Sequence, residues 1–430
     1  MMSYMTIDLN DTNIRVGKGE QILLNSPGYA VIKDEKIAFG TQAEKIKRIY
    51  PRSTHDDYWY RLGQVAIQST SNQIRHNADL AYMQLAEIYE ETGKSTKWII
   101  AVPASFNQDQ LALLLGLLKA ANFTEVQLID SALLASINNL TRGEHIHLDI
   151  QLHQSVLTTL ESGDKHNVTA TNVLPDAGLL GIYEECAKLI SNEFINQSRF
   201  DPHHHAESEQ LLFENISSCL NKLNISPMSK VDIEYKGSTY SANISREAIL
   251  EVLSPIYDGI YKYIDDAKPL LLSHRFGMLP SFEDNLSNVI FLDEFALFTS
   301  AKKYSTLILK TDSNYLSELP TSEVKKDSNR LETTNSSTTS ITHILLDGIA
   351  YKLNEQKDCY ITTDNIIEAS LKSNTCFSIR FIGGQFLLNT ENDTLVSLNN
   401  VIVKDRQSLK LGDIIKASGL EKNSLLIKVS

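Results

Sequence analysis

The composition of the chain changes abruptly between residues 311 and 341. This stretch, TDSNYLSELPTSEVKKDSNRLETTNSSTTSI, is rich in Ser, Thr, Asn and charged residues, so it offers little apolar surface to bury. A segment of this kind behaves as a flexible coil. The whole chain has 430 residues with 42% hydrophobic content, which is too long for one ordinary domain. We therefore expect two folded domains, residues 1–310 and 342–430, joined by a flexible linker over residues 311–341.

The sequences on the two sides of this linker have different apolar patterns. Residues 1–310 alternate buried-type strands such as WIIAVPASF with helical repeats such as NADLAYMQLAEIYEETGK, which predicts an α/β domain. Gly93 is expected to end one helix, and Asn107 and Ser245 are expected to cap the start of two others. Residues 342–430 contain short strands separated by turn signals, which predicts an all-β domain.

Charge and composition exclude several classes of protein. The formal net charge is −13, which argues against a nucleic-acid partner because binding to phosphate backbones depends on clustered Lys and Arg. The four cysteines lie far apart in the sequence, so neither a zinc ribbon nor a disulfide framework is expected. The start, MMSYMTIDLN, lacks the pattern of a signal peptide, and no run of about 18 apolar residues suggests insertion into a membrane. These features predict a cytoplasmic protein.

Six stretches of residues 1–310 resemble, in the same order, motifs of the actin and seventy-kilodalton heat-shock chaperone superfamily. The stretch IDLNDTNIRV is similar to the first phosphate hairpin, and HLDIQLHQSVLTTL falls where the second one belongs. The run IAVPASFNQDQLALLLGLLKAANFTEVQLIDSALLAS and the helix start LLGIYEECAKLISNEF lie before and after the second hairpin, as in the chaperones. The stretch ISREAILEVLSPIYDGIYKYIDDA resembles the helix beside the adenosine, and NVIFLDEFALFTSAKK falls at the adenosine loop. The resemblance implies a two-lobed α/β actin-like (ribonuclease-H-like) ATPase fold.

The same resemblance implies a nucleotide site in a cleft between two lobes. In this superfamily two β-hairpins approach the phosphates with backbone amides, and two aspartates orient the magnesium shell and the attacking water. The matching aspartates here are Asp8 and Asp149, which would be the catalytic residues and, through Mg-ATP, the metal-binding ones. Thr12 offers a hydroxyl group at the first hairpin.

The glycines that allow this approach are replaced by larger residues. The replaced positions are Asn10 and Asp11 in the first hairpin, Gln151, Leu152 and His153 in the second hairpin, and Asp293 and Glu294 in the adenosine loop. In addition, Ser131 stands where the chaperones carry a metal-shell glutamate. We expect the side chains of residues 151–153 to fill the space of a β- or γ-phosphate. The sequence therefore predicts a pseudo-ATPase that needs no cofactor; the alternative is a divergent ATP-hydrolysing chaperone relative that binds Mg-ATP.

Three other groups of residues carry open interpretations. His145 and His147 share one strand face with Asp149, which is compatible with a metal site or with solvated histidines at a strand edge. The histidines of residues 203–205 precede a predicted helix and are interpreted as a loop. The aromatic residues within positions 56–60 form either an exposed contact patch or a packing cluster between lobes.

The C-terminal domain resembles the second half of a forkhead-associated β-sandwich. The matching residues are Asn399, Leu409, Gly412, Asp413 and Ile414. Where this family carries the Gly-Arg pair that recognises phosphothreonine, the sequence reads YITTDNIIEAS with no arginine, and no Ser-x-x-His signature follows it, so we expect an interaction sandwich without phosphopeptide binding. The leading hypothesis is a cytosolic scaffold or adaptor that binds protein partners through this domain. A further possibility is similarity to the actin-fold adaptors of pilus and secretion machines.

Overall fold

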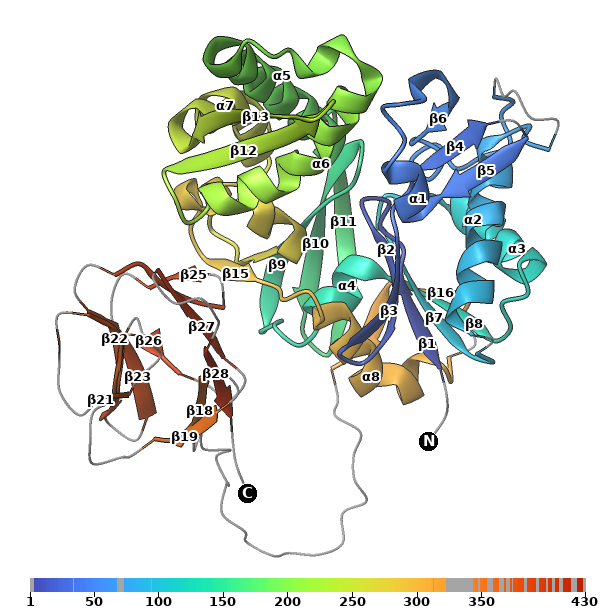
Figure 1. The fold of residues 1–430 in the computed structure, drawn as a ribbon. Helices are drawn as coiled ribbons and strands as arrows, with labels where there is room; N and C mark the ends of the chain where they lie inside the picture. Colours follow the sequence, from blue (N-terminus) through green and yellow to red (C-terminus); the bar gives the residue numbers. More distant parts are fainter. Residues whose placement is uncertain are drawn as a thin grey trace, which may run out of the picture. The chain divides into compact units, whose positions relative to one another are not determined.

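A computed structural model describes residues 4–33, 35–67, 73–93, 95–311 and 313–321, together with most of the strands between residues 343 and 427 and parts of their connections. The chain divides into two compact units, Met1–Lys325 and Lys326–Ser430, coloured from blue to gold and from orange to red in Figure 1. The boundary between the units falls inside the segment that was predicted as a linker.

The first sheet of the first unit has six strands in the order β16-β8-β7-β1-β2-β3. The central strand β1 pairs antiparallel with β2 and parallel with β7; β2 and β3 are antiparallel, and β7 and β8 are parallel. The strands are β1 (Met5–Asp8), β2 (Ile14–Lys18), β3 (Gln21–Ser26), β7 (Trp98–Val102), β8 (Val126–Asp130) and β16 (Tyr315–Leu316).

The second sheet also has six strands, in the order β15-β14-β9-β10-β11-β17, and it repeats the directions of the first. Its strand β9 pairs antiparallel with β10 and parallel with β14; β10 and β11 are antiparallel, and β14 and β15 are parallel. The strands are β9 (Gly143–Ile150), β10 (Gln154–Ser162), β11 (Lys165–Pro175), β14 (Leu270–Leu272), β15 (Val289–Phe291) and β17 (Glu318–Pro320). Each sheet thus begins with an antiparallel hairpin, and the turns of these two hairpins carry the candidate site.

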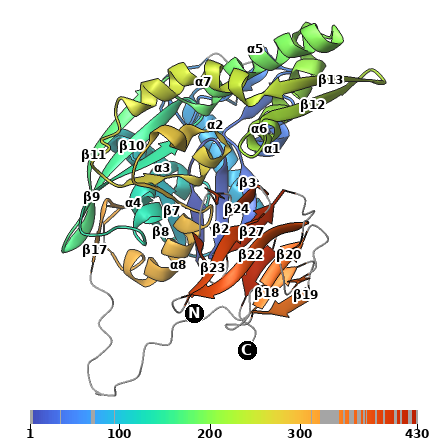
Figure 2. The same ribbon diagram turned by 90° about the vertical axis from the view of Figure 1, so that its left-hand side faces the viewer.

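Helices and smaller sheets surround the two large sheets (Figure 2). We call residues 4–136 the first half and residues 143–308 the second half. The first half adds β4 (Ala30–Lys33), β5 (Lys36–Phe39), α1 (Gly40–Glu44), η1 (Pro51–Ser53), β6 (Thr54–His55), α2 (Asn77–Thr92), α3 (Gln108–Ala120) and α4 (Ser131–Ser136). The second half adds α5 (Leu179–Ser198), η2 (Pro202–His204), α6 (Ala206–Leu223), β12 (Met228–Tyr235), β13 (Ser238–Ser245), α7 (Arg246–Tyr261), η3 (His274–Met278), η4 (Phe282–Asn285) and α8 (Ala296–Ile308).

Local signals in the sequence explain several element boundaries. The side chain of Asn107 accepts a hydrogen bond from the backbone N–H of Gln110 and begins α3, and Ser245 begins α7 in the same way. Gly93 follows the last turn of α2 with a positive φ of 78°, as predicted. The tract 203–205 contributes to η2 immediately before α6, which confirms its interpretation as a loop that precedes a helix.

The predicted start of the linker at residue 311 is wrong. Residues 315–320 form β16 and β17, which add one strand to the first sheet and one to the second. Tyr315 holds β16 against the first sheet, because its hydroxyl group donates to the buried carboxylate of Asp130 at 3.0 Å. The sequence alone predicts a linker here because the composition of the whole stretch is polar, and one tyrosine with two short strands does not change that composition. The rest of the predicted linker, residues 322–341, lies outside the described residues.

The C-terminal unit contains two antiparallel sheets. One has the order β19-β18-β28-β27-β24-β25 and the other the order β21-β20-β22-β23-β26. The strands are β18 (His343–Leu346), β19 (Ile349–Lys352), β20 (Cys359–Thr362), β21 (Ile367–Glu368), β22 (Thr375–Ile382), β23 (Gln385–Thr390), β24 (Val396–Leu398), β25 (Val401–Ile402), β26 (Gln407–Ser408), β27 (Ile414–Ala417) and β28 (Ser424–Ile427). Ile344 of the first sheet and Phe377 of the second belong to one buried cluster, so the two sheets share a core.

Candidate functional site

Asp8 lies at the end of β1 and is almost completely buried. The residue opposite it in the antiparallel register of β2 is Arg15. The Nη2 and Nε atoms of Arg15 donate to Asp8 Oδ2 at 2.8 and 3.2 Å, and its Nη1 donates to the main-chain oxygen of Glu294 at 2.8 Å. The first aspartate of the predicted metal site is therefore already bound by a cation of its own hairpin.

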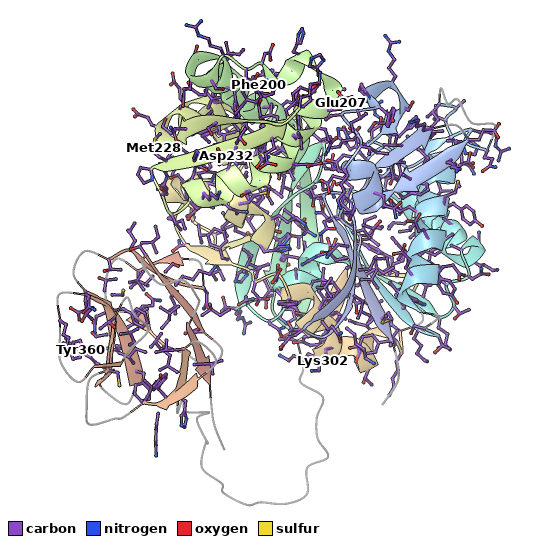
Figure 3. The ribbon with its side chains drawn as sticks, viewed as in Figure 1. Phe200, Glu207, Met228, Asp232, Lys302 and Tyr360 are labelled. Carbon is purple, nitrogen blue, oxygen red and sulfur yellow. The ribbon has the colours of Figure 1, made fainter. Side chains whose placement is uncertain are left out.

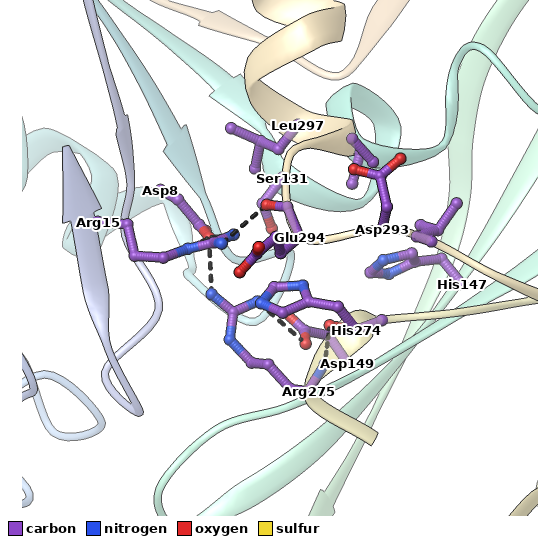
Figure 4. A pocket seen from close by; sticks show the side chains of 14 residues that line it. Asp8, Arg15, Ser131, His147, Asp149, His274, Arg275, Asp293, Glu294 and Leu297 are labelled. Carbon is purple, nitrogen blue, oxygen red and sulfur yellow. Dashed lines mark hydrogen bonds and ion pairs between the residues drawn. The ribbon is translucent and has the colours of Figure 1, made fainter. Parts of the chain in front are cut away.

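A second cation, Arg275, lies between Asp8 and Asp149. It belongs to η3, the turn that directly follows β14, and Figure 4 shows its guanidinium group between the two carboxylates. Its Nη2 donates to Asp8 Oδ2 at 2.6 Å, and its Nη1 lies 3.2 Å from Asp149 Oδ2. Its Nε donates to the hydroxyl oxygen of Thr12 at 3.1 Å. One guanidinium group thus binds the three residues that the resemblance assigns to Mg-ATP.

Side chains of the first hairpin turn bind the second hairpin directly. Asn10 Nδ2 donates to Asp149 Oδ2 at 2.9 Å and to the main-chain oxygen of Ile150 at 3.0 Å. Asp11 Oδ1 accepts the backbone N–H of Leu152 at 2.8 Å. Asn10 and Asp11 thus join the two hairpins directly and leave no room between the hairpins at these contacts.

The side chains of Gln151, Leu152 and His153 point away from the two aspartates. Gln151 pairs with Gln154 of the same turn, with 2.5 Å between Oε1 and Nε2. Leu152 is buried in a small apolar cluster with residues of the first half, among them Tyr29. His153 Nε2 lies 3.0 Å from the main-chain oxygen of Asp56, and its ring stacks on that of Tyr60.

The expectation that residues 151–153 fill the phosphate space is therefore wrong. These residues contact the first half or their own turn, and none of them lines the cavity at the aspartates. The residue that takes the space is Arg275. Gly178 fixes this course of the turn, because a Cβ atom on Gly178 would lie 2.3 Å from the main-chain carbon of His153.

Two hollows border the charge cluster. One, of about 650 Å³, is lined by Arg15, His274 and Glu294 among others but by neither aspartate, and the other, which reaches both aspartates, is very small. Its volume is about 20 Å³, which is room for about one water molecule, whereas ligand pockets span roughly 300–1,000 Å³. Its lining brings together Asp8, Asp149, Asp293 and Glu294 of the predicted residues, and Ser131. Asp293 does not point at a ligand position, because its Oδ1 accepts the backbone N–H of Phe295 at 2.7 Å at the start of α8.

The opposite charges in the cluster favour the ionised forms of Asp8 and Arg275. Burial disfavours the charge of Asp8, but the guanidinium groups of Arg275 and Arg15 outweigh burial and hold the pKa of Asp8 well below its usual range. Burial likewise disfavours the charge of Arg275, yet Asp149 and Asp8 raise its pKa above its ordinary value. Two arginines facing two aspartates balance the charge. A divalent cation would have to displace Arg275 to reach both carboxylates.

Asp11 differs from the other two carboxylates. Burial raises the pKa of Asp11 to about 6, against the opposing effect of the hydrogen bond from the backbone N–H of Leu152. Asp8, by contrast, accepts hydrogen bonds from two guanidinium groups, those of Arg15 and Arg275. Asp11 is thus a buried acid whose charge costs stability near neutral pH.

Arg48, which lies between α1 and η1, makes a further set of contacts that joins the two halves. Arg48 donates to Glu184 of α5 and lies 3.5 Å from Glu209 of α6. The guanidinium carbon of Arg48 lies 3.5 Å from the ring centre of Phe213, and its backbone N–H donates to Gln210 at 3.0 Å. Together with Arg275 and His153, Arg48 holds the halves together at a third place.

The histidine and aromatic candidates take structural positions. Burial lowers the pKa of His147, and His145 Nε2 lies 3.0 Å from the hydroxyl group of Thr141. Within the described residues, no group of three or more His, Cys, Asp or Glu side chains is arranged to hold a metal ion. Tyr58 and Trp59 are buried and both bind the side chain of Gln84, so the interpretation as an exposed contact patch is wrong for them.

The motif residues of the C-terminal unit hold one another. Asn399 Nδ2 donates to Asp413 Oδ1 at 2.8 Å, and Asn399 Oδ1 accepts the backbone N–H of Ile414 at 2.9 Å. Asn399 has a positive φ of 52°, which asparagine tolerates better than most residues. Leu409 is buried in the shared core, and Gly412 lies outside the described residues. The described part of this pattern therefore stabilises a turn.

Sequence reasoning missed Arg15, Arg275 and the turn that carries Arg275. The adenosine loop was expected at Asp293 and Glu294, whereas the turn that reaches the aspartates follows β14. A signal was present in LLLSHRF, where an arginine follows a wholly apolar strand. An arginine at such a position needs a buried acid as its partner, and the candidate acids were Asp8 and Asp149.

Comparison with known proteins adds no family. No family model matches the chain, and no curated protein matches it. Among the described residues, no helix has the length and apolarity needed to cross a bilayer.

Proposed function

We propose that the chain is a pseudo-ATPase of the actin and heat-shock chaperone type that serves as a scaffold or adaptor for protein partners. The observation that carries this proposal is the position of Arg275, whose guanidinium group occupies the space between Asp8 and Asp149. In a working relative this space would belong to magnesium and the phosphates. The repeated strand order of the two sheets, with facing hairpins, supports the resemblance on which the proposal rests.

The contacts around Arg275 favour a scaffold over the ATP-hydrolysing alternative. Binding of Mg-ATP would require Arg275 to leave two ion pairs, and the hydrogen bonds of Asn10 and Asp11 to the second hairpin would have to break. Breaking a buried ion pair on one side costs about 3–5 kcal/mol. The hydrogen bonds between the two hairpins hold the two halves together without a cofactor. The C-terminal β unit is then the proposed site of partner binding, in the cytoplasm.

Thermal unfolding of the full chain with and without millimolar Mg-ATP tests this proposal. A ligand at 100 times its Kd adds about 2.7 kcal/mol to the stability of the folded state, so binding would raise the melting temperature by several degrees. The proposal predicts no shift beyond that produced by magnesium chloride and an equal ionic strength of sodium sulfate. An upward shift specific to Mg-ATP would favour the ATP-binding alternative.

A further inference from the structure

The β12–β13 hairpin of the second half forms a two-stranded sheet of its own (Figure 2). On the β13 side, Gln197 of α5 covers the backbone of Asn243: its Nε2 donates to the main-chain oxygen at 3.0 Å, and its Oε1 accepts the N–H at 2.8 Å. On the other side, β12 has no strand partner besides β13 among the described residues. The protein thus caps one edge of the hairpin at Asn243 with a side-chain amide. On the other edge, which we call the open edge, the Ser226 hydroxyl caps the first residue of β12: it donates to the main-chain oxygen of Met228 at 2.8 Å and accepts its N–H at 3.3 Å.

The register shows which backbone groups point outward from β12. Lys230 stands opposite Asn243, whose N–H and C=O groups point away from β12 toward Gln197. In an antiparallel pair, opposite residues either bond each other or both point outward. The N–H and C=O of Lys230 therefore point to the open edge. The bond from the Arg246 N–H to the Pro227 oxygen at 2.8 Å, which flanks the Met228 pair, agrees with this assignment.

Because strand residues alternate, Asp232 and Glu234 also direct their backbone groups to the open edge. Within the part of the chain that the structure describes, no hydrogen bond engages the backbone N–H or C=O of Lys230, Asp232 or Glu234 apart from the β12–β13 ladder. Unpaired groups of this kind are a template for another strand.

The exposed side chains of β12 include one positive charge, at Lys230, and two negative charges, at Asp232 and Glu234. Met228, Lys230, Asp232 and Glu234 are exposed on one face, and the residues between them are buried. Lys230 and Asp232 are 59% and 45% exposed, and 2.9 Å separates Lys230 Nζ from Asp232 Oδ1. Figure 3 shows Met228 and Asp232 along this strand.

We propose that this edge pairs with the same edge of a second copy of the chain. A two-fold axis at Val231 places Lys230 opposite Asp232 of the other copy, and Asp232 opposite its Lys230. Opposite charges facing each other across strands stabilise pairing. The result is a continuous four-stranded antiparallel sheet in which each interface patch contacts itself, as two-fold dimers require.

The neighbouring registers are disfavoured by charge. An axis at Lys230 would place the two lysines opposite each other. An axis at Asp232 would place the two aspartates opposite each other at the centre, although it would also place each Lys230 opposite Glu234 of the other copy. Like charges directly opposite are destabilising. The register centred on Val231 avoids both like-charge contacts and also aligns Met228 with Glu234 of the second copy. The charge pattern of β12 therefore selects one alignment.

Charge exchange tests the dimer and its register in the full chain. Sedimentation equilibrium of the wild type should give a reversible monomer–dimer equilibrium. Lys230→Asp alone and Asp232→Lys alone should each weaken dimerisation at least about tenfold, because symmetry turns two attractive pairs into two repulsive ones. The double variant Lys230→Asp/Asp232→Lys should restore it. Lys36→Asp makes the same charge change at an exposed strand position of another hairpin and should leave the dimer unchanged.

A cysteine pair provides an independent test of the register. Met228→Cys combined with Glu234→Cys should give a covalent dimer on mild oxidation, because directly opposite Cα atoms lie about 5.5 Å apart in such a sheet, within the range that a disulfide bridges. Each single cysteine variant should remain uncross-linked, since the native cysteines are buried.

Two results would overturn the proposal. One is a wild-type chain that stays monomeric at concentrations of hundreds of micromolar, in which case the charges of β12 protect the edge against pairing. The other is a dimer that neither single charge variant weakens. Circular dichroism of each variant separates loss of pairing from loss of folding. None of these readouts depends on nucleotide binding.

Discussion

Replacement of Arg275 by methionine tests the energetic role of the buried charge cluster. Methionine keeps an unbranched side chain but removes the charge, so Asp149 loses its guanidinium partner and Asp8 keeps only Arg15. The side chains of Arg275, Asp8 and Asp149 are 8%, 2% and 15% exposed, so solvent cannot replace the lost partner fully. Removal of one partner from a buried ion pair costs about 3–5 kcal/mol, and we expect Arg275→Met to lower the free energy of unfolding by that amount.

Urea unfolding followed by tryptophan fluorescence measures this effect in the first unit. The chain has two tryptophans, Trp59 and Trp98, and both are buried in the first half. The double variant Arg275→Met/Asp149→Asn should recover part of the loss, because it removes the unpaired carboxylate as well. Lys165→Met, which breaks the exposed pair with Glu318, is the control and should cost at most about 1 kcal/mol. A loss below about 1 kcal/mol for Arg275→Met would refute the reasoning.

Three further predictions concern the hairpins and the contact between the halves. Because the pKa of Asp11 is raised to about 6, its carboxyl group binds a proton more tightly in the folded state than in the unfolded state. The protonated carboxyl group therefore contributes stability at pH 4, and this contribution is lost as the pH rises through 6. Asp11→Asn should therefore raise the free energy of unfolding on the order of 2 kcal/mol at pH 7.5 and leave it unchanged at pH 4, and equal effects at both pH values in urea titrations would contradict this. Gly178→Ala should lower the urea midpoint markedly, because the new Cβ would lie 2.3 Å from the main chain of His153. The control is Gly181→Ala in the first turn of α5, where the nearest atom to a Cβ lies 3.6 Å away; it should be neutral or stabilise the fold by a few tenths of a kcal/mol. Arg48→Ala should increase amide hydrogen exchange in α1 and α6, measured by mass spectrometry, and unchanged protection there would show that Arg48 does not hold the halves together.

Local signals were sufficient to predict most elements of the first unit. The caps at Asn107 and Ser245 were found from residue type and spacing alone, whereas the two aspartates at strand ends were found through the resemblance to the superfamily. Such features depend on neighbours within a few positions, which is where sequence patterns carry their information.

The central interaction of the site could not be predicted in this way. Arg275 and Asp8 are 267 positions apart in the chain, and no periodicity links them. The same holds for Asp11 and Leu152, which are 141 positions apart. Sequence reasoning singled out the residues of the two hairpin turns, but it did not predict that Leu152 and His153 contact the first half and that Gln151 pairs with Gln154 of its own turn. Their direction is set by the close packing of the turn against Gly178, which only the tertiary structure reveals.

A crystal structure of the full chain grown with millimolar Mg-ATP tests the central claim most directly. The account predicts that Arg275 remains between Asp8 and Asp149 and that no triphosphate or cation binds there. A triphosphate with its cation seated at these carboxylates, with the Arg275 side chain displaced, would contradict it.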